Sequence, residues 1–188
     1  MRRTAAVVAA MATAITMSLA TPASARVLEK GTFHNEGSFR QRNFCDQPGL
    51  TVRTDFVVDG TFMIRTRGKD QIPYYSEHGD LKAVITNVAT GEYVTQVEHV
   101  LDKDQRITDN GDGTFTILVL ATGNSVVYDS TGKAIARNPG QIRFEILIDN
   151  GGTPQDPTDD EFLDFLGVVK GSTGRSDDFC TAVVGAIG

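Results

Sequence analysis

Apolar and polar residues alternate through most of this chain, and the alternation is clearest in QIRFEILID, residues 141–149. Every second residue from the start of this stretch is apolar: Ile142, Phe144, Ile146 and Ile148. A period of two is typical of a β-strand with one buried face. TFTILVL, residues 114–120, repeats the pattern. Since residues 26–188 offer no run of ten or more residues at helical spacing for a crossover helix, the sequence predicts an all-β fold.

Short turn-forming sequences separate the predicted strands. TVRTDFVVDGTFMIRTR, residues 51–67, reads as two strands around Asp59-Gly60, which is a strong hairpin signal. The other predicted joints share residues that accept a positive φ or preset a turn, and they lie at 89–91, 109–113, 129–132 and 138–140. Short connections join antiparallel neighbours. The sequence therefore predicts an up-and-down meander of about eight or nine strands.

The first 25 residues have the form of a signal peptide. Arg2 and Arg3 precede an apolar run over 5–20, and Ala23-Ser24-Ala25 has the small-x-small pattern of a cleavage site. The run is shorter than the ~20 residues of a membrane-spanning helix. We expect cleavage after Ala25 and a secreted, extracellular chain that forms a single domain over 26–188. No membrane span is expected in that mature chain.

The two cysteines decide how the meander is expected to close. Cys45 precedes the first strong strand, Cys180 follows the last, and export favours a disulfide between them. A disulfide requires the two Cα atoms to lie within ~7 Å. Its formation would bring the first and last strands together, so we predict a closed β-barrel, with a two-sheet β-sandwich as the alternative. Residues 26–44 are expected to wrap the outside or one end.

The charge of the chain argues against some partners. Its 24 Asp and Glu exceed its 18 Lys and Arg, and removal of Arg2 and Arg3 makes the mature chain still more acidic. No basic stripe is present, which disfavours binding to nucleic acids and to anionic membranes. The three histidines have no second ligand at metal spacing. No metal and no cofactor is therefore predicted.

Parts of the chain resemble a known group of proteins. ITDNGDGTFTILVLATGN at 107–124, the stretch 137–174, the closing DFC at 178–180 and FC at 44–45 resemble small secreted proteins of actinobacteria, a group without a characterised activity. The resemblance implies an exported protein. It supplies no catalytic motif that could be carried onto positions of this sequence.

Three side chains stand out as candidate ligand-binding residues. Tyr74 and Tyr75 lie in IPYYSEHGD, at 72–80, which could form the lip of a cavity, and His99 lies in a strand with Thr95, Val97 and Leu101 on the same face. If that face lined the barrel, His99 would be an interior polar group. The acidic stretch 151–162 is either a proline-stiffened loop or a calcium site. Pro154, Pro157 and the lack of a DxDxDG order of acids favour the loop.

The most consistent function is an exported, non-enzymatic β-barrel that binds a small apolar molecule or a protein partner. An eight-stranded barrel is just wide enough to hold one small ligand. The alternative is a barrel-pocket isomerase or cyclase of the allene oxide cyclase or dirigent type, with His99, Tyr74, Tyr75 or Glu77 as polar participants. That alternative requires at least two of these side chains within hydrogen-bond reach in one cavity.

Overall fold

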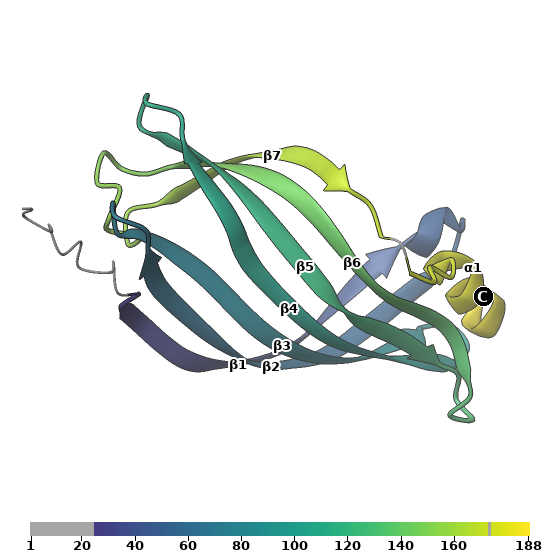
Figure 1. Ribbon diagram of the computed structural model, residues 1–188. Coiled ribbons are helices and arrows are strands. Elements are labelled where there is room, and N and C mark those ends of the chain that lie inside the picture. Colours follow the sequence, from purple (N-terminus) through teal and green to yellow (C-terminus); the bar gives the residue numbers. More distant parts are fainter. Residues whose placement is uncertain (1–24, 173) are drawn as a thin grey trace, which may run out of the picture.

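Seven antiparallel strands form one sheet in chain order in the computed structural model, which describes residues 25–172 and 174–188 (Figure 1). The strands are β1 (Val27–Arg42), β2 (Thr51–Arg67), β3 (Ile72–Asn87), β4 (Tyr93–Asp109), β5 (Thr114–Tyr128), β6 (Ala134–Asp149) and β7 (Glu161–Lys170). A single 3-10 turn, η1 (Phe44–Asp46), follows β1, and helix α1 (Phe179–Ile187) ends the chain. Most of the predicted signal peptide, residues 1–24, lies outside the described residues.

The predicted all-β, antiparallel, up-and-down arrangement is confirmed, but the strands are longer and fewer than predicted. Asp59-Gly60 does not turn the chain, because both residues lie inside the 17-residue strand β2. Asn138-Pro139-Gly140 likewise lies inside β6. Residues 27–42 do not wrap the outside, because they form the edge strand β1. None of the helices among the described residues has the length and apolar character needed to cross a membrane.

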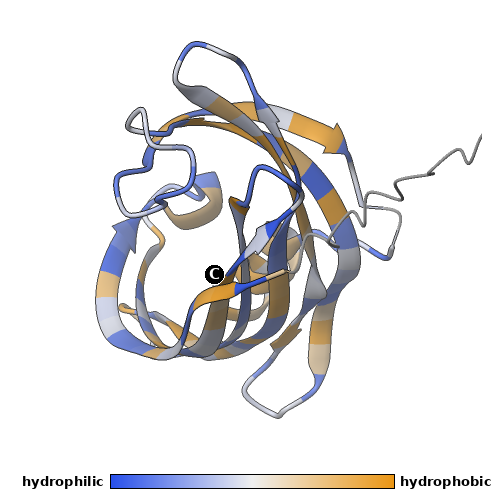
Figure 2. Cartoon of the chain, turned by 60° about the vertical axis from the view of Figure 1, so that its left-hand side comes forward, coloured by the Kyte–Doolittle hydropathy of each residue, from blue (hydrophilic) through white to orange (hydrophobic). Residues whose placement is uncertain are grey.

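The predicted closure into a barrel is wrong. The sheet curls strongly (Figure 2), yet within the described residues its two edge strands, β1 and β7, are not hydrogen-bonded neighbours. The reason lies in where the chain goes after β7. That strand pairs with β6 only between Arg143 and Asp149, and the chain then continues as an irregular segment to α1. The disulfide therefore joins η1, which follows β1, to α1, which follows β7. It does not bring β1 and β7 into hydrogen-bonded pairing.

A row of glycines crosses the sheet in register. Gly60 of β2 lies opposite Gly79 of β3, which lies opposite Val100 of β4. Val100 lies opposite Gly123 of β5, and Gly123 lies opposite Gly140 of β6. We call these four glycines the glycine row. Glycine inside a strand marks a tight bend or a close approach of another group, and aligned glycine kinks are a device for curving a sheet. The strands curve along their length in Figure 1.

Two positions of the glycine row differ in the space around them. A Cβ atom on Gly60 would lie 2.1 Å from Cζ of Phe33 and 2.4 Å from the carbonyl oxygen of His78, whereas a Cβ on Gly79 would meet nothing within 4 Å. We therefore expect Gly60→Ala to lower the free energy of unfolding by about 2 kcal/mol or more, and Gly79→Ala to change it by less than about 0.5 kcal/mol. Urea denaturation measures both. If both substitutions changed the free energy of unfolding equally, the crowding at Gly60 would be contradicted.

The inner face of the sheet is the face on which α1 packs. Val183 and Ile187 of α1 are fully buried against a cluster that includes Val52, Ile85 and Val94 of the sheet. A second cluster, at the other end of the same face, consists of Phe115, Ile117, Val119 and Ile148. These two clusters hold the ends of the curled sheet together and leave the middle of the inner face less filled.

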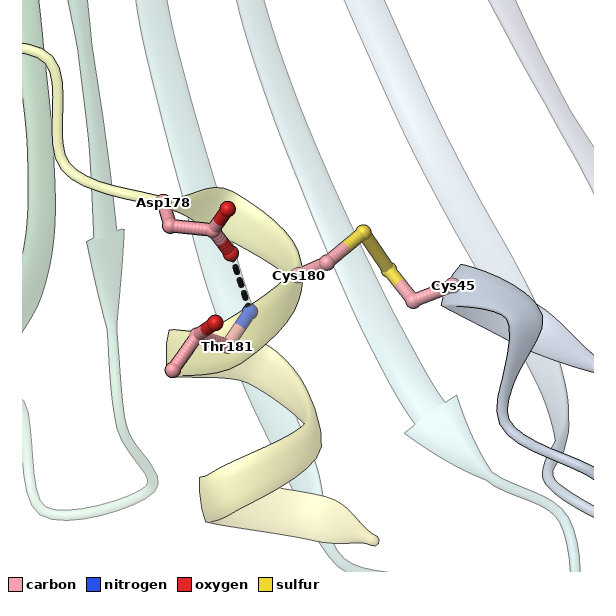
Figure 3. Close-up of a disulfide and its surroundings, with 4 residues drawn as sticks. All are labelled: Cys45, Asp178, Cys180 and Thr181. Carbon is pink, nitrogen blue, oxygen red and sulfur yellow. Dashed lines mark hydrogen bonds between the residues drawn. A yellow bond between two sulfur atoms is a disulfide. The ribbon is translucent and has the colours of Figure 1, made fainter.

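Helix α1 is fixed at both ends. The Asp178 carboxylate accepts a hydrogen bond from the Thr181 N–H at the N-terminus (Figure 3), which satisfies one of the free amides of the first turn. The Asn87 side-chain amide donates to the carbonyl oxygen of Ile187 at 2.6 Å. The predicted disulfide is confirmed, with the Cα atoms of Cys45 and Cys180 5.4 Å apart. The C-terminal segment is therefore attached to both the sheet and η1.

The disulfide closes a loop with a sequence separation of 135 residues. In the chain-entropy account, removing a cross-link over a loop of this size lowers the free energy of unfolding by roughly 5 kcal/mol. We expect Cys45→Ser/Cys180→Ser to show a correspondingly lower midpoint in guanidinium denaturation. Wild-type protein treated with a reductant serves as the control, since it should approach the same midpoint. An unchanged midpoint in the double variant would contradict this assignment.

Candidate functional site

A cavity of about 350 Å³ lies on the inner face above the glycine row. Gly123 and Gly140 form its floor, and their missing side chains leave room for the Ser172 hydroxyl and the His99 carbonyl oxygen to approach them. One wall is polar and comes from β4, β5 and β6: Glu98, Ser125 and Asn138. The opposite wall is apolar: Val100, Ala121 and Ile142. We call this space the inner cavity.

The strand register explains why these side chains meet. Glu98 lies opposite Ser125, and Ser125 lies opposite Asn138, so three neighbouring strands present one polar row. Four residues further along, beyond Gly123 and Gly140, Ala121 lies opposite Ile142. Because side chains alternate between the faces, both rows project inward with the glycines between them. The cavity is thus a direct consequence of the register of β4, β5 and β6.

A second cavity of about 220 Å³ adjoins the inner cavity on the side of α1. It shares Glu98, Ser125 and Asn138 with the first and is bounded by Phe179 at the start of α1. The Gln96 side-chain amide donates to Glu98 Oε1 at 2.6 Å and to Ser125 Oγ at 3.4 Å. This network orients the polar wall and leaves the hydroxyl and amide groups of the wall able to bind a ligand.

The segment after β7 forms one border of the cavities. Ser172 and Ser176 line the inner cavity, and Ser172 Oγ lies close to the position that a Cβ on Gly140 would take. Further along, the Asp177 N–H donates to the carbonyl oxygen of Arg137 at 3.1 Å, and the Arg137 N–H donates to Asp177 Oδ2 at 3.0 Å. The disulfide at Cys180 follows three residues later. The segment between β7 and α1 is therefore hydrogen-bonded to β6 through Asp177 and attached to η1 through the disulfide of Cys180.

The three side chains predicted to bind a ligand are not brought together. Tyr75 lies on the inner face, while Tyr74 lies on the outer face, with the Arg67 guanidinium carbon 4.5 Å from its ring centroid. His99 also lies on the outer face, where its Nδ1 is 2.5 Å from Oδ1 of Asp80 and its side chain is 65% exposed. In β4 the even-numbered residues from Val94 to Asp104 point inward, so His99 points outward. None of the three lines the inner cavity.

Tyr75 belongs to a group of acidic and phenolic side chains on the inner face. Its O–H donates to Glu77 Oε2 at 2.7 Å, and its backbone N–H donates to Asp104 Oδ2 at 2.7 Å. Asp102 lies directly opposite Glu77 in the neighbouring strand. Burial raises the pKa of Asp104 to about 6, and burial followed by the charge of Glu77 raises the pKa of Asp102. These groups hold protons more tightly than free carboxyls do.

The raised pKa of Asp104 makes stability depend on pH. The folded state binds the Asp104 proton more tightly than the unfolded chain, whose carboxyl has a pKa of 3.8, so the free energy of unfolding falls as pH rises from about 4 to about 6. Asn has no proton to lose, so we expect Asp104→Asn to lack this fall in the free energy of unfolding. The variant should therefore be more stable than wild type at neutral pH, by up to about 3 kcal/mol. Urea denaturation across this pH range measures it.

The control for this experiment is Asp70→Asn, which changes an exposed carboxylate in the turn between β2 and β3. It should follow the wild-type dependence on pH. Two results would contradict the raised pKa of Asp104. In one, the free energy of unfolding of Asp104→Asn changes with pH between 4 and 6 as it does in wild type. In the other, Asp104→Asn is less stable than wild type at neutral pH.

The acidic loop 151–162 uses several of its carboxylates in turns. Asp156 accepts hydrogen bonds from the backbone N–H and the hydroxyl of Thr158 at 3.0 and 2.6 Å, and Asp159 accepts from the Thr153 hydroxyl at 2.6 Å. Among the residues that the structure describes, no three His, Cys, Asp or Glu side chains are grouped so that they could hold a metal ion. The geometry therefore favours the turn-forming interpretation of this loop.

The sequence interpretation missed the residues of the inner cavity. Asn138 belongs to the stretch 138–140 that was predicted to be a joint, so β6 was divided at the wrong place. A usable signal was available: Gly123 and Gly140 each lie between two alternating segments that keep the same phase across the glycine. A turn would have no reason to preserve that phase, whereas a bent, continuous strand does.

Comparison with known proteins adds no relative: no family model, no curated protein and no solved structure matches this chain. The resemblance to small secreted actinobacterial proteins therefore stays a prediction. Function has to be inferred from the geometry of the sheet and its cavities.

Proposed function

We propose that the protein is an exported, non-enzymatic binding protein that holds one small, mainly apolar molecule in the inner cavity. The observation that carries this proposal is a cavity of about 350 Å³ with a glycine floor, an apolar wall and an opposite polar wall. Small-molecule sites in proteins are typically concave and mostly apolar, with a few polar groups that fix orientation. The ligand we expect has an apolar body and at least one hydroxyl or amide group.

The chemistry of the walls narrows the ligand class. Val100, Ala121 and Ile142 favour contact with hydrocarbon, and the Asn138 amide and Ser125 hydroxyl both donate and accept hydrogen bonds. Glu98 disfavours an anionic ligand, because it would place a second negative charge in the same cavity. A neutral or cationic amphipathic molecule satisfies all three conditions. Export agrees with the Cys45–Cys180 disulfide, since disulfides persist in oxidising compartments.

The barrel-pocket isomerase or cyclase is the second candidate, and one observation favours it. Tyr75 and Glu77 lie within hydrogen-bond reach on the inner face, which meets the distance part of the condition set from the sequence. The requirement for a shared cavity is not met, because Glu77 lines a cavity of about 400 Å³ whose lining does not include Tyr75. However, Tyr74 and His99 lie on the outer face, and Tyr75 is not among the residues that line the inner cavity. The four side chains predicted to take part in an enzyme reaction are therefore not in the inner cavity, so binding is the better-supported function.

The proposal is tested by filling the cavity. We expect wild-type protein to bind N-phenyl-1-naphthylamine, an uncharged amphipathic fluorophore, with a rise in fluorescence, because the cavity offers an apolar wall. Ala121→Leu places a larger side chain in the cavity and should weaken binding at least tenfold, which corresponds to about 1.4 kcal/mol. Val97→Leu, which adds bulk on the outer face of β4, is the matched control and should bind as wild type does.

Native mass spectrometry of protein purified without denaturant gives an independent measurement. Wild type should carry an additional mass that is absent from Ala121→Leu and present in Val97→Leu. Binding of the fluorophore that is equal in all three proteins, together with a bare mass for wild type, would overturn the proposal.

A further inference from the structure

Strand β7 is an edge strand with apolar side chains exposed on both faces. Six of its ten residues are large and apolar and between 46 and 59% exposed: Phe162, Leu163, Phe165, Leu166, Val168 and Val169. One edge of β7 pairs with β6, and within the described residues the other edge has no neighbouring strand. An exposed apolar edge strand offers a template for pairing with another strand. We propose that β7 pairs antiparallel with β7 of a second copy of this chain, about a two-fold axis through Phe165.

The side chains of β7 are self-complementary in this register. The pairing of β6 with β7 places Phe162, Phe165 and Val168 opposite the inner residues Ile148, Ile146 and Phe144. A two-fold axis through Phe165 sets Phe165 opposite itself and Phe162 opposite Val168 of the second copy. All inward-facing side chains then meet inward-facing ones. The bulges between these positions recur identically in the second copy, so a symmetric pair accommodates them.

The remaining positions are mixed: Asp164 comes opposite Leu166 and Glu161 opposite Val169 of the second copy, and the exposure of these four positions leaves both carboxylates in water. Leu163 comes opposite Gly167 of the second copy, which has φ +118° and space around its Cα for a neighbouring leucine. The Phe165 N–H already donates to Asp164 Oδ1 at 2.8 Å. Because this N–H is already bonded, the two copies meet at the axis through the Phe165 side chains. The backbone N–H and C=O groups on either side of the axis then pair between the copies.

Charge selects a second copy over an unrelated strand. In the proposed register Asp160, directly before β7, lies opposite Lys170 of the second copy, and this pair occurs twice in the dimer. Asp160 lies among acids of its own chain, namely Asp149, Asp156 and Asp159, whose charges, after burial, raise its pKa. A lysine delivered by the second copy would offset this repulsion. No such symmetry holds for a foreign peptide.

Disulfide trapping tests the register. Phe165→Cys should form an intermolecular cross-link under mild oxidation, because residue 165 lies opposite itself on the axis. Val57→Cys, on the outer face in the interior of the sheet, is the control and should stay monomeric on a non-reducing gel. If Phe165→Cys gives no more dimer than Val57→Cys, the register is wrong.

Charge exchange tests the partner. Sedimentation velocity should show that wild type forms dimers as its concentration rises, and that Asp160→Lys and Lys170→Glu each raise the dissociation constant at least tenfold. An equimolar mixture of the two variants should dimerise again, because each lysine then faces an acid across the axis. Both changes are at exposed positions, so the monomer fold is kept. A monomeric wild type, or a mixture as weak as the single variants, would overturn the proposal.

Discussion

The bend of the sheet at the glycine row is the constraint on which the rest of the structure depends. Strands of 15–17 residues with bulky side chains at every inward position could not curl tightly, because those side chains would collide on the concave side. Removing side chains from one row across β2, β3, β5 and β6 relieves that crowding where the curvature is needed. The same absence of side chains lets Ser172 Oγ and the His99 carbonyl oxygen approach Gly140 and Gly123 at the floor of the inner cavity. The curvature of the sheet and the floor of the cavity therefore both depend on the glycine row.

The C-terminal segment completes the cavity and depends on contacts outside itself. Nine residues are too few to form a stable isolated helix in water, since helix nucleation is unfavourable and short helices gain few hydrogen bonds. Helix α1 forms because Val183 and Ile187 are buried on the sheet, Asp178 caps its first turn and Cys180 is bonded to Cys45. The stretch from Ser172 to Asp177, which borders the cavities, is held at its far end by the same contacts.

Much of the fold could be predicted from local pattern, and the failures have identifiable physical causes. Alternation identified the type of structure, and the presence of just two cysteines in a chain predicted to be exported identified the disulfide. Glycine misled the interpretation, because Asp59-Gly60 allows either a hairpin turn or a bend in a continuous strand, and only the partner strand decides between them. Strand β1 was missed because it is an edge strand with most side chains exposed, so burial imposes little alternation on its sequence.

The candidate site was harder to predict than the fold, because the face to which a side chain points depends on register. His99 and Glu98 are adjacent, yet one lies on the outer face and the other lines the inner cavity. A shift of one residue exchanges the two faces of a strand. From the sequence, His99 was a candidate on the condition that its face, with Thr95, Val97 and Leu101, lined the barrel. The structure assigns to the interior the face that carries Gln96, Glu98, Asp102 and Asp104.

The two edges of the sheet differ in a way that bears on association. β1 has charged residues spread along its length, namely Glu29, Lys30, Glu36, Arg40 and Arg42, and charges on an edge disfavour pairing with another sheet. β7 instead combines apolar side chains on both faces with only three charged residues, Glu161, Asp164 and Lys170. The charges on β1 protect that edge from pairing. The apolar edge of β7 needs no such protection if another strand normally covers it. The asymmetry therefore favours β7 over β1 as the surface that meets a second copy.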